Sequence, residues 1–390
     1  IAELDMIPDI SFEEEEEEIV MTEEIDETSS QVVRLVDQTI ITALRKNASD
    51  IHVEPSPITN KTTIRLRLDG VCQEYMQIPN SMARGVLSRL KIMAGIDIAE
   101  RRLPQDGKIK FRRKGIPPLD LRLATLPTAG GHEDAVLRLL AASGALKLDE
   151  MGLSERNLQV MKKILVQPYG LILAVGPRQV EVKPKIGLDF ARIMRSFLRA
   201  DPDVIMIGEM RDSETASIGI EASLTGHLVF STLHTNSASE TITRLLDMGL
   251  NPLNFSDALL GVLAQRLIRK LCSNCRKKYN PSLEEFEALV AEYGKEAFQS
   301  VNIEYSPKLV LYRPSGCDAC SGTGYKGRRA IHELLEGTPT IKRLIKKEAM
   351  TDEIFLQGVR DGMTTLKQDG ISKVFLGLTD ISEVRRVCID

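Results

Sequence analysis

Three continuous apolar runs constrain the fold of this 390-residue chain more than any other feature. They are Leu171–Val175, Val204–Ile207 and Leu228–Phe230, and helix-like stretches separate them. Uninterrupted apolar runs are typical of strands that are covered on both faces, and their alternation with helices indicates a parallel sheet. The sequence therefore predicts an α/β domain over residues 149–270. We expect its functional residues at the carboxyl edge of the sheet.

Residues 29–148 follow a different pattern and predict a separate α+β domain. The stretch Thr63–Leu68 alternates apolar residues with arginine and ends in Asp-Gly, as a half-buried strand entering a hairpin turn does. Arg65 and Arg67 should share the exposed face of that strand, and the same alternation places Arg122 on the exposed face of another. A solvated basic face is the simplest interpretation of this pattern.

The first residues of the chain are strongly acidic. Residues 1–28 include the run Glu13–Glu18 and contain no Lys or Arg. Such a run repels itself and stays solvated, so we predict an acidic linker or tail. The net charge of −4 therefore conceals a basic remainder. That excess fits a protein that handles polyphosphate or an acidic surface, and it is too diffuse to indicate nucleic-acid binding.

The strongest local motif is a pair of Cys-x-x-Cys sequences. Its members are Cys272, Cys275, Cys317 and Cys320. Four thiolates can hold one Zn²⁺ tetrahedrally and leave no open position, which predicts a structural zinc site. Disulfides are the alternative, but Cys72 and Cys388 are isolated and no export signal is visible. We expect a zinc-knuckle subdomain over residues 271–330, with a helix near Ser282–Tyr293 in the insert.

Polar residues cluster after the second and third apolar runs. Gly208-Glu209 follows the second run and places a carboxylate at the edge of the sheet. Such a Glu can polarise a water for attack on a phosphoryl group or help to hold Mg²⁺. His227 and His234 flank the third run. Taken alone, a strand that ends in an acid is common, and a lone His is more often structural.

Together these motifs resemble the secretion and pilus-assembly ATPases of bacterial type II secretion and type IV pilus systems. The matching segments, in the family's order, are Ala48–Pro55, Arg102–Gly107, Asp201–Asp212, Leu224–Asn236, Val262–Leu267 and the four cysteines. The resemblance covers essentially residues 30–390. It implies a RecA-type P-loop ATPase domain preceded by a PAS-like domain, with residues 331–390 as the C-terminal helical part of the ATPase.

The resemblance also implies roles for individual residues. Glu209 would be the catalytic carboxylate of an atypical Walker B motif, and His227 and His234 would form the family's His box. The expected nucleotide-binding residues are Arg65, Arg67, Arg102, Arg122, Gly176, Pro177 and Arg266. ATP, Mg²⁺ and Zn²⁺ are the expected cofactors.

The resemblance further implies how the protein would work in the cell. The expected assembly is a cytoplasmic homo-hexamer, associated peripherally with the inner membrane through its partners. Those partners would be an inner-membrane platform protein and cytoplasmic membrane-anchoring proteins. Nucleic acid is not expected among them.

One departure from the family's pattern is serious. In the family, the strand that matches Leu171–Val175 runs into Gly-Pro and then a P-loop, whereas here Arg178 follows Pro177 at once. No Gly-x-x-x-x-Gly-Lys-[Ser/Thr] sequence occurs anywhere in the chain, and the acidic motif expected after it is missing too. P-loop amides and Lys hold the phosphates, and the Ser/Thr holds Mg²⁺. A chain that joins Pro177 directly to Arg178 should therefore not hydrolyse ATP.

Two explanations of this departure are open. Either the natural polypeptide contains a segment between residues 177 and 178 that this sequence lacks, or the segment has been deleted. We favour the first, because a deletion would remove part of the centre of the sheet and leave an apolar face uncovered. The segment's presence predicts an ATP-driven motor for pilin-like subunits, and its absence predicts a nucleotide-free scaffold or regulatory subunit. A zinc-ribbon nucleic-acid protein ranks last, because the chain is only 4% aromatic and has no Trp.

Overall fold

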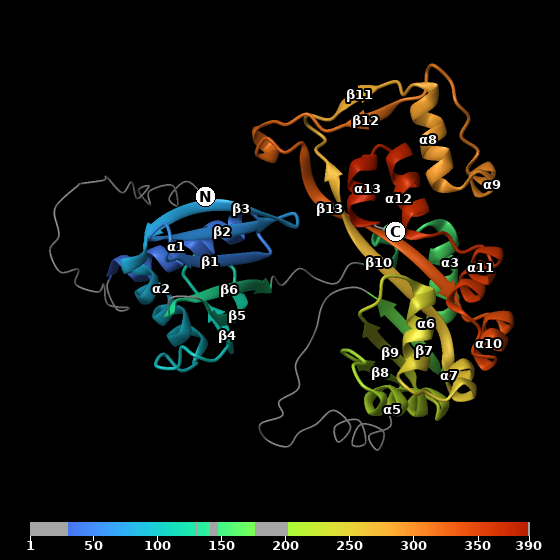
Figure 1. The fold of residues 1–390 in the computed structure, drawn as a ribbon, viewed down its shortest axis with the longest axis horizontal. Helices are drawn as coiled ribbons and strands as arrows, with labels where there is room; N and C mark the ends of the chain where they lie inside the picture. The colour runs from blue at the N-terminus through green and yellow to red at the C-terminus, as the bar shows by residue number, and fades with distance from the viewer. Residues whose placement is uncertain (1–29, 129–130, 141–146, 176–201, 389–390) are drawn as a thin grey trace. The chain divides into compact units, whose positions relative to one another are not determined.

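The computed structural model describes residues 30–128, 131–140, 147–175 and 202–388 (Figure 1). The chain divides into two compact units, Ile1–Gly144 and Ala145–Asp390. The predicted acidic tail at residues 1–28 lies outside the described residues, as do Gly176, Pro177 and the segment 178–185. None of the described helices combines the length and apolar character that crossing a membrane requires.

The first unit is an antiparallel sheet with two helices on one face. Its six strands lie in the order β3-β2-β1-β6-β5-β4. The elements are α1 (Ser30–Arg45), β1 (Asp50–Ser56), β2 (Lys61–Leu68), β3 (Val71–Pro79), α2 (Asn80–Ala94), β4 (Gln105–Phe111), β5 (Leu119–Pro127) and β6 (Glu133–Leu140). Asp69 and Gly70 both have positive φ, as the predicted two-residue hairpin turn requires. The assignment of this unit as PAS-like stays a prediction.

The two faces of this first sheet differ in character. Ile64 and Leu66 of β2 are buried in the core that α1 and α2 complete. Because side chains alternate along a strand, Arg65 and Arg67 lie on the opposite face. The expected strand thus forms, and its arginines stand on the sheet face away from the helical core.

The second unit contains a mixed sheet surrounded by helices. Its elements up to the first Cys-x-x-Cys sequence are α3 (Glu155–Leu165), β7 (Gly170–Val175), β8 (Val204–Ile207), α5 (Ser213–Leu224), β9 (Leu228–Leu233), α6 (Ala238–Asp247), α7 (Pro252–Ala258) and β10 (Leu259–Leu271). The later elements are β11 (Lys277–Tyr279), α8 (Leu283–Tyr293), α9 (Lys295–Phe298), β12 (Leu311–Arg313), β13 (Tyr325–Glu336), α10 (Pro339–Lys346), α11 (Thr351–Arg360), α12 (Leu366–Phe375) and α13 (Ile381–Val387).

The central sheet of this unit has the order β13-β10-β7-β9-β8. Strands β10, β7, β9 and β8 are parallel, and β13 joins β10 antiparallel. Leu171 and Leu173 pack on one face among α5, α6, α7, α10 and α11, while Ile172 packs on the other face against α3. The α/β fold class expected from the three apolar runs is confirmed.

One of the three runs is less covered than the sequence predicts. Ile205 and Ile207 of β8 are buried, but Val204 is 55% exposed and Met206 73% exposed. Strand β8 lies at the edge of the sheet, and α3 covers the same face only further in, over Ile172 and Leu228. The expectation that this strand is covered on both faces is therefore wrong for the described residues.

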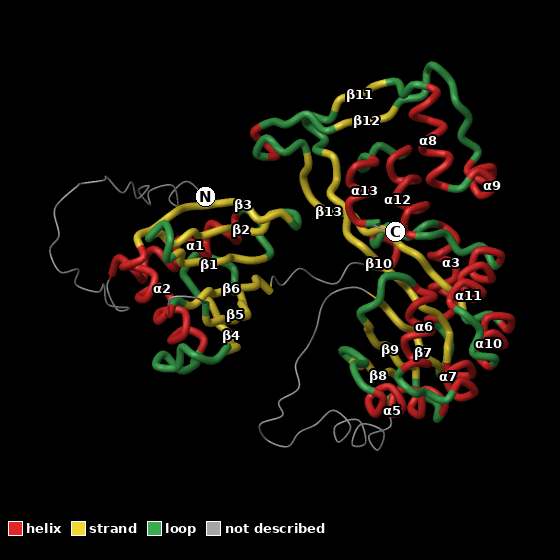
Figure 2. Tube along the Cα trace, in the orientation of Figure 1, coloured by secondary structure: helices red, strands yellow, loops and turns green. Residues whose placement is uncertain are grey.

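Strands β10 and β13 extend from the central sheet to the cysteine region. They run side by side as a long antiparallel pair that reaches the region of the paired strands β11 and β12 (Figure 2). Strand β13 (Tyr325–Glu336) is continuous through the boundary expected between residues 330 and 331. The four-cysteine region and the sheet therefore share two strands.

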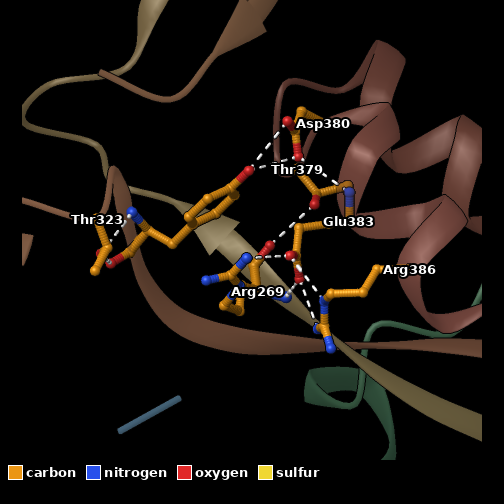
Figure 3. A network of polar contacts seen from close by, with 7 residues as sticks. Arg269, Thr323, Thr379, Asp380, Glu383 and Arg386 are labelled. Carbon is orange, nitrogen blue, oxygen red and sulfur yellow. Dashed lines mark hydrogen bonds and ion pairs between the residues drawn. The ribbon is translucent and has the colours of Figure 1, made fainter. Parts of the chain in front are cut away.

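A polar network fixes the C-terminal helix α13 to β10. The Glu383 carboxylate accepts hydrogen bonds from Arg269 and Arg386, and Thr379 Oγ1 donates to Arg269 O (2.9 Å) (Figure 3). Asp380 caps α13 by accepting from Glu383 N. The spacing of these two acids is that of a capping box, but the Glu383 side chain bonds to arginine instead of returning to the cap.

Candidate active site and candidate metal centre

The carboxyl ends of β8 and β9 are held together by backbone and hydroxyl hydrogen bonds. Thr232 Oγ1 donates to Gly208 O (2.5 Å), and Met210 N donates to Thr232 O (3.0 Å). These bonds continue the parallel pairing of Ile207 with Ser231 beyond the end of β8. The chain that carries Glu209 is thereby fixed against β9.

The Glu209 carboxylate lies between two basic side chains. Its Oε1 is 3.1 Å from His234 Nε2, and its Oε2 accepts from Arg211 Nε at 2.6 Å. The Glu209 side chain is only 12% exposed, whereas both partners reach solvent. A carboxylate fixed in this way can orient a water and accept its proton.

Arg266 joins the same edge of the sheet from β10. Ala264 pairs with Val175 at the end of β7, so Arg266 lies beyond the carboxyl end of that strand. Its Nη2 donates to Asn236 Oδ1 (2.8 Å). Residues that follow β8 and β9, together with one residue of β10, thus bring a carboxylate, an imidazole and a guanidinium to one edge of the sheet.

His227 lies at the opposite end of β9 from His234. Its Nδ1 is 3.0 Å from Ala222 O, and its carbonyl accepts from Gly170 N at 3.1 Å. Seven residues of strand correspond to about 23 Å. The structure therefore does not bring the two histidines together within one chain, and a catalytic role for His227 stays a prediction.

The four arginines assigned to the nucleotide from the first unit are all paired within that unit. Arg65 contacts Glu54 (2.5 Å), Arg67 contacts Asp50 (3.4 Å), Arg102 contacts Glu100 (3.0 Å) and Arg122 contacts Asp106 (3.9 Å). The pairs of Arg65, Arg102 and Arg122 are at least partly exposed, and such pairs are weak, so these arginines can exchange partners at small cost. The partner of Arg67, Asp50, is buried.

Sequence reasoning missed Arg138, which extends the row of arginines. In the sheet register Asp50 pairs with both Arg67 and Arg138, and Arg138 pairs with Arg122. Asp50 is buried and bridges two guanidiniums, at 2.9 Å to Arg138. Burial raises the Asp50 pKa, but hydrogen bonds from Arg138 and Ser49 outweigh it and leave the pKa below its ordinary value. The alternation that revealed Arg122 could have revealed Arg138.

Arg211 and Asn236 were also missed as site residues. Both lie inside the segments that carry the resemblance, but neither was assigned a role. Arg211 follows Glu209 by two residues and returns to it as an ion pair. This contact depends on the turn that follows β8, and a separation of two residues in the sequence does not by itself predict an ion pair.

The four cysteines form one compact cluster. Their sulfurs lie within 4.8 Å of one another, with separations of 3.9 Å for Cys272–Cys317, 3.8 Å for Cys275–Cys320 and 3.7 Å for Cys317–Cys320. Four sulfurs at the usual zinc distance of about 2.3 Å lie about 3.8 Å apart in a tetrahedron. Disulfide bonding requires about 2.05 Å, so the alternative to a metal site does not fit.

Backbone amides support one of these thiolates. Cys317 N and Gly324 N each lie 3.2 Å from Cys320 Sγ and donate to it. Burial raises the Cys320 pKa, but these bonds outweigh it and lower the pKa to about 6. Gly316, Gly322 and Gly324 around the cysteines have positive φ. Glycine adopts this backbone conformation without steric cost, so the chain can turn tightly there. The donor set and its spacing fit Zn²⁺.

Comparison of the sequence with models of known protein families shows which family matches this chain. The family model described as "Type II/IV secretion system protein" matches residues 25–178 and 174–386. The chain belongs to this family. The two matched segments of the secretion-family chain overlap at residues 174–178, beside the end of β7.

Several curated relatives are similar over most of this secretion-family chain. The type IV pilus assembly ATPase PilB of Thermus thermophilus is 41% identical over 407 residues, which cover 95% of the chain and 44% of the relative. PilB of Pseudomonas aeruginosa is 39% identical over 92% of the chain and 68% of its own length. The type II secretion system ATPase E of Vibrio cholerae is 37% identical over 95% and 78%. The chain thus spans less than half of the Thermus relative.

Solved structures share the fold at lower sequence identity. The ATPase DotB of Legionella pneumophila superposes with a TM-score of 0.60 at 17% identity, covering 91% of this chain and 95% of that one. The pilus retraction motor PilT with bound ADP gives a TM-score of 0.54 at 22% identity, covering 90% and 96%. The secretion-family chain therefore has the fold of these ATPases.

Proposed function

We propose that this chain is an ATP-hydrolysing motor of a type II secretion or type IV pilus assembly machine. The observation that carries the proposal is Glu209, held between Arg211 and His234 at the carboxyl edge of the sheet. In open α/β sheets this edge is where ligands bind. The family membership and the names of the curated relatives support the same activity.

In the proposed reaction Glu209 orients a water molecule and takes its proton as the oxygen bonds to the γ-phosphorus. The bond from that phosphorus to the bridging oxygen breaks, ADP leaves with the electron pair, and inorganic phosphate forms. His234 and Arg211 hold the carboxylate in position. Mg²⁺ supplied with ATP would neutralise part of the phosphate charge.

We further propose that the active polypeptide carries a phosphate-binding segment between residues 177 and 178. The two family matches meet at this point of the chain. The alignment with the Thermus relative is 407 residues long, longer than this whole 390-residue chain, so that relative has residues without a counterpart here. The exposed Val204 and Met206 of β8 supply an apolar surface for such a segment to cover.

Peptide mass mapping across the Pro177–Arg178 junction and ATP hydrolysis of the purified natural protein test both parts. The motor proposal expects additional residues between these two positions and measurable turnover. A natural protein that joins Pro177 directly to Arg178 and shows no turnover would instead be a nucleotide-free scaffold or regulatory subunit of the same machine. The absence of a P-loop from this sequence is the observation that favours that second function.

The assembly and metal content belong to the same proposal. The motor would be a cytoplasmic homo-hexamer that contacts an inner-membrane platform protein and cytoplasmic anchoring proteins. One Zn²⁺ at the four cysteines would fix the β11–β12 region on the sheet, in a structural role because four thiolates fill its coordination.

A further inference from the structure

The helix α2 has a polar face that lines a pocket in the first unit. Asn80, Arg84, Ser88 and Lys91 recur at helical spacing and form one wall. The lining also includes Arg101 and His132, and the pocket has a volume of about 270 Å³. The pocket lies wholly within this unit and does not include the residues proposed for hydrolysis.

The lining of this pocket includes a buried ion pair. Lys91 Nζ donates to Glu133 Oε1 (2.6 Å) and to Glu100 O (2.7 Å). The side chains of Lys91 and Glu133 are 1% and 5% exposed. This pair balances its own charge, so the Arg101 guanidinium adds a positive charge to the pocket lining. Lys91 also retains a third N–H beyond its two bonds.

A hydroxyl and a half-buried guanidinium complete the donor set. Ser88 is only 6% exposed, and its Oγ has no hydrogen-bond partner among the described residues. Arg101 likewise has no ion pair within the described part of the chain. Hydroxyl, ammonium and guanidinium groups thus line one small cavity, whose Glu133 carboxylate is paired with Lys91.

We propose that this pocket binds a phosphate-sized oxyanion, with inorganic phosphate as the ligand. Its volume is below the roughly 300–1,000 Å³ typical of pockets for larger organic ligands. Guanidinium and ammonium donors form strong, charge-assisted hydrogen bonds to phosphate, and a hydroxyl can add a neutral one. The site is separate from the proposed hydrolysis of ATP and does not depend on it.

Thermal unfolding of the full protein in sodium phosphate, compared with sodium chloride at equal ionic strength, tests the site. Phosphate should raise the Tm of the parent and of Arg45→Ala, an exposed arginine outside the pocket. Arg101→Ala should lose most of that rise. The proposal is overturned if the parent shows no rise, or if Arg101→Ala keeps all of it because phosphate acts elsewhere.

A matched pair of variants at Ser88 provides an independent measurement. Ser88→Asp places a carboxylate in the pocket as a covalent substitute for the anion, and Ser88→Asn is the neutral control of the same shape. Without phosphate, the Asp variant should have the higher Tm, and it should no longer respond to phosphate. An Asp variant that is less stable than the Asn variant contradicts a cationic pocket, because the new charge would then be buried without compensation.

Discussion

His234 Nε2 lies 3.1 Å from Glu209 Oε1, although the two residues follow different strands of the sheet. The imidazole is bonded to one carboxylate oxygen and the Arg211 guanidinium to the other, at 2.6 Å. Such a carboxylate has little freedom to rotate. The fixed position of the carboxylate, in addition to its negative charge, therefore allows it to orient a water molecule.

The first prediction concerns this carboxylate. Glu209→Gln, in the natural polypeptide, should reduce ATP turnover by roughly 10²-fold or more and leave ATP binding nearly intact. The amide keeps the shape but cannot accept the proton of water. Steady-state hydrolysis and nucleotide-binding titrations measure the two effects. Glu221→Gln, on the exposed surface of α5, is the matched control, and parental turnover in Glu209→Gln would exclude this residue as the base.

The second prediction is that the four-cysteine cluster holds one Zn²⁺ per chain. Cys272→Ser or removal of the metal should unfold the knuckle, because such sites contribute on the order of 10 kcal/mol to a small module. Metal analysis of protein purified without chelator gives the stoichiometry. Cys72→Ser and Cys388→Ser serve as controls and should keep full zinc content. A zinc content well under one per chain in the parent would contradict the assignment.

The third prediction assigns an arginine of the first unit to the nucleotide. At least one of Arg65, Arg67, Arg102 and Arg122 should face the phosphates near Glu209, in its own or a neighbouring subunit. Its Ala variant should lose roughly 10³-fold in turnover without unfolding. Arg113→Ala is the control, since Arg113 is also paired with a carboxylate, Asp37, at 2.6 Å. Parental turnover in all four variants would exclude the assignment.

The fourth prediction concerns acid stability. Burial raises the Glu383 pKa, but hydrogen bonds from Arg386 and Arg269 outweigh it and lower the pKa from 4.5 to about 2. The unfolded chain therefore binds this proton first as the pH falls. The stability that Glu383 provides is fully present above about pH 4.5 and is lost as the pH approaches 2.

Unfolding by denaturant at several pH values measures this contribution. Glu383→Gln should flatten the pH dependence below pH 4.5 and cost about 3–5 kcal/mol at neutral pH, because it breaks a buried pair. Glu292→Gln, which breaks the more exposed pair with Arg385, should cost about 1 kcal/mol or less. An unchanged acid slope in Glu383→Gln would show that other carboxylates determine it.

Much of the fold follows from local patterns in the sequence. The alternation around Arg65 and the apolar run at Leu171 each predict the right kind of strand, because burial on one face or two leaves a periodic signature. The exposed face of β8 does not follow, since Val204 and Met206 look buried in sequence. Their exposure depends on which elements pack beside β8, and the apolar pattern of the sequence does not specify that packing.

The candidate site is only partly readable from sequence for the same reason. Glu209 and the four cysteines have motifs of their own. Arg211, Asn236 and Arg138 act through partners that the fold brings to them, and their contacts exist only once the strands are paired. His227 and His234 are close in sequence, yet the strand between them separates them.

The continuity of β10 has a mechanical consequence. Arg266 lies at the proposed phosphate edge, and Cys272 follows the end of the same strand six residues later, about 20 Å away. Pairing with β13 stiffens this length of strand, apart from a register shift between Arg269 and Leu271, and no loop intervenes. The cysteine cluster is thus attached to the phosphate edge as the end of a continuous lever. A small rotation of β10 at Arg266 would appear, enlarged by that length, as a sideways displacement of the knuckle.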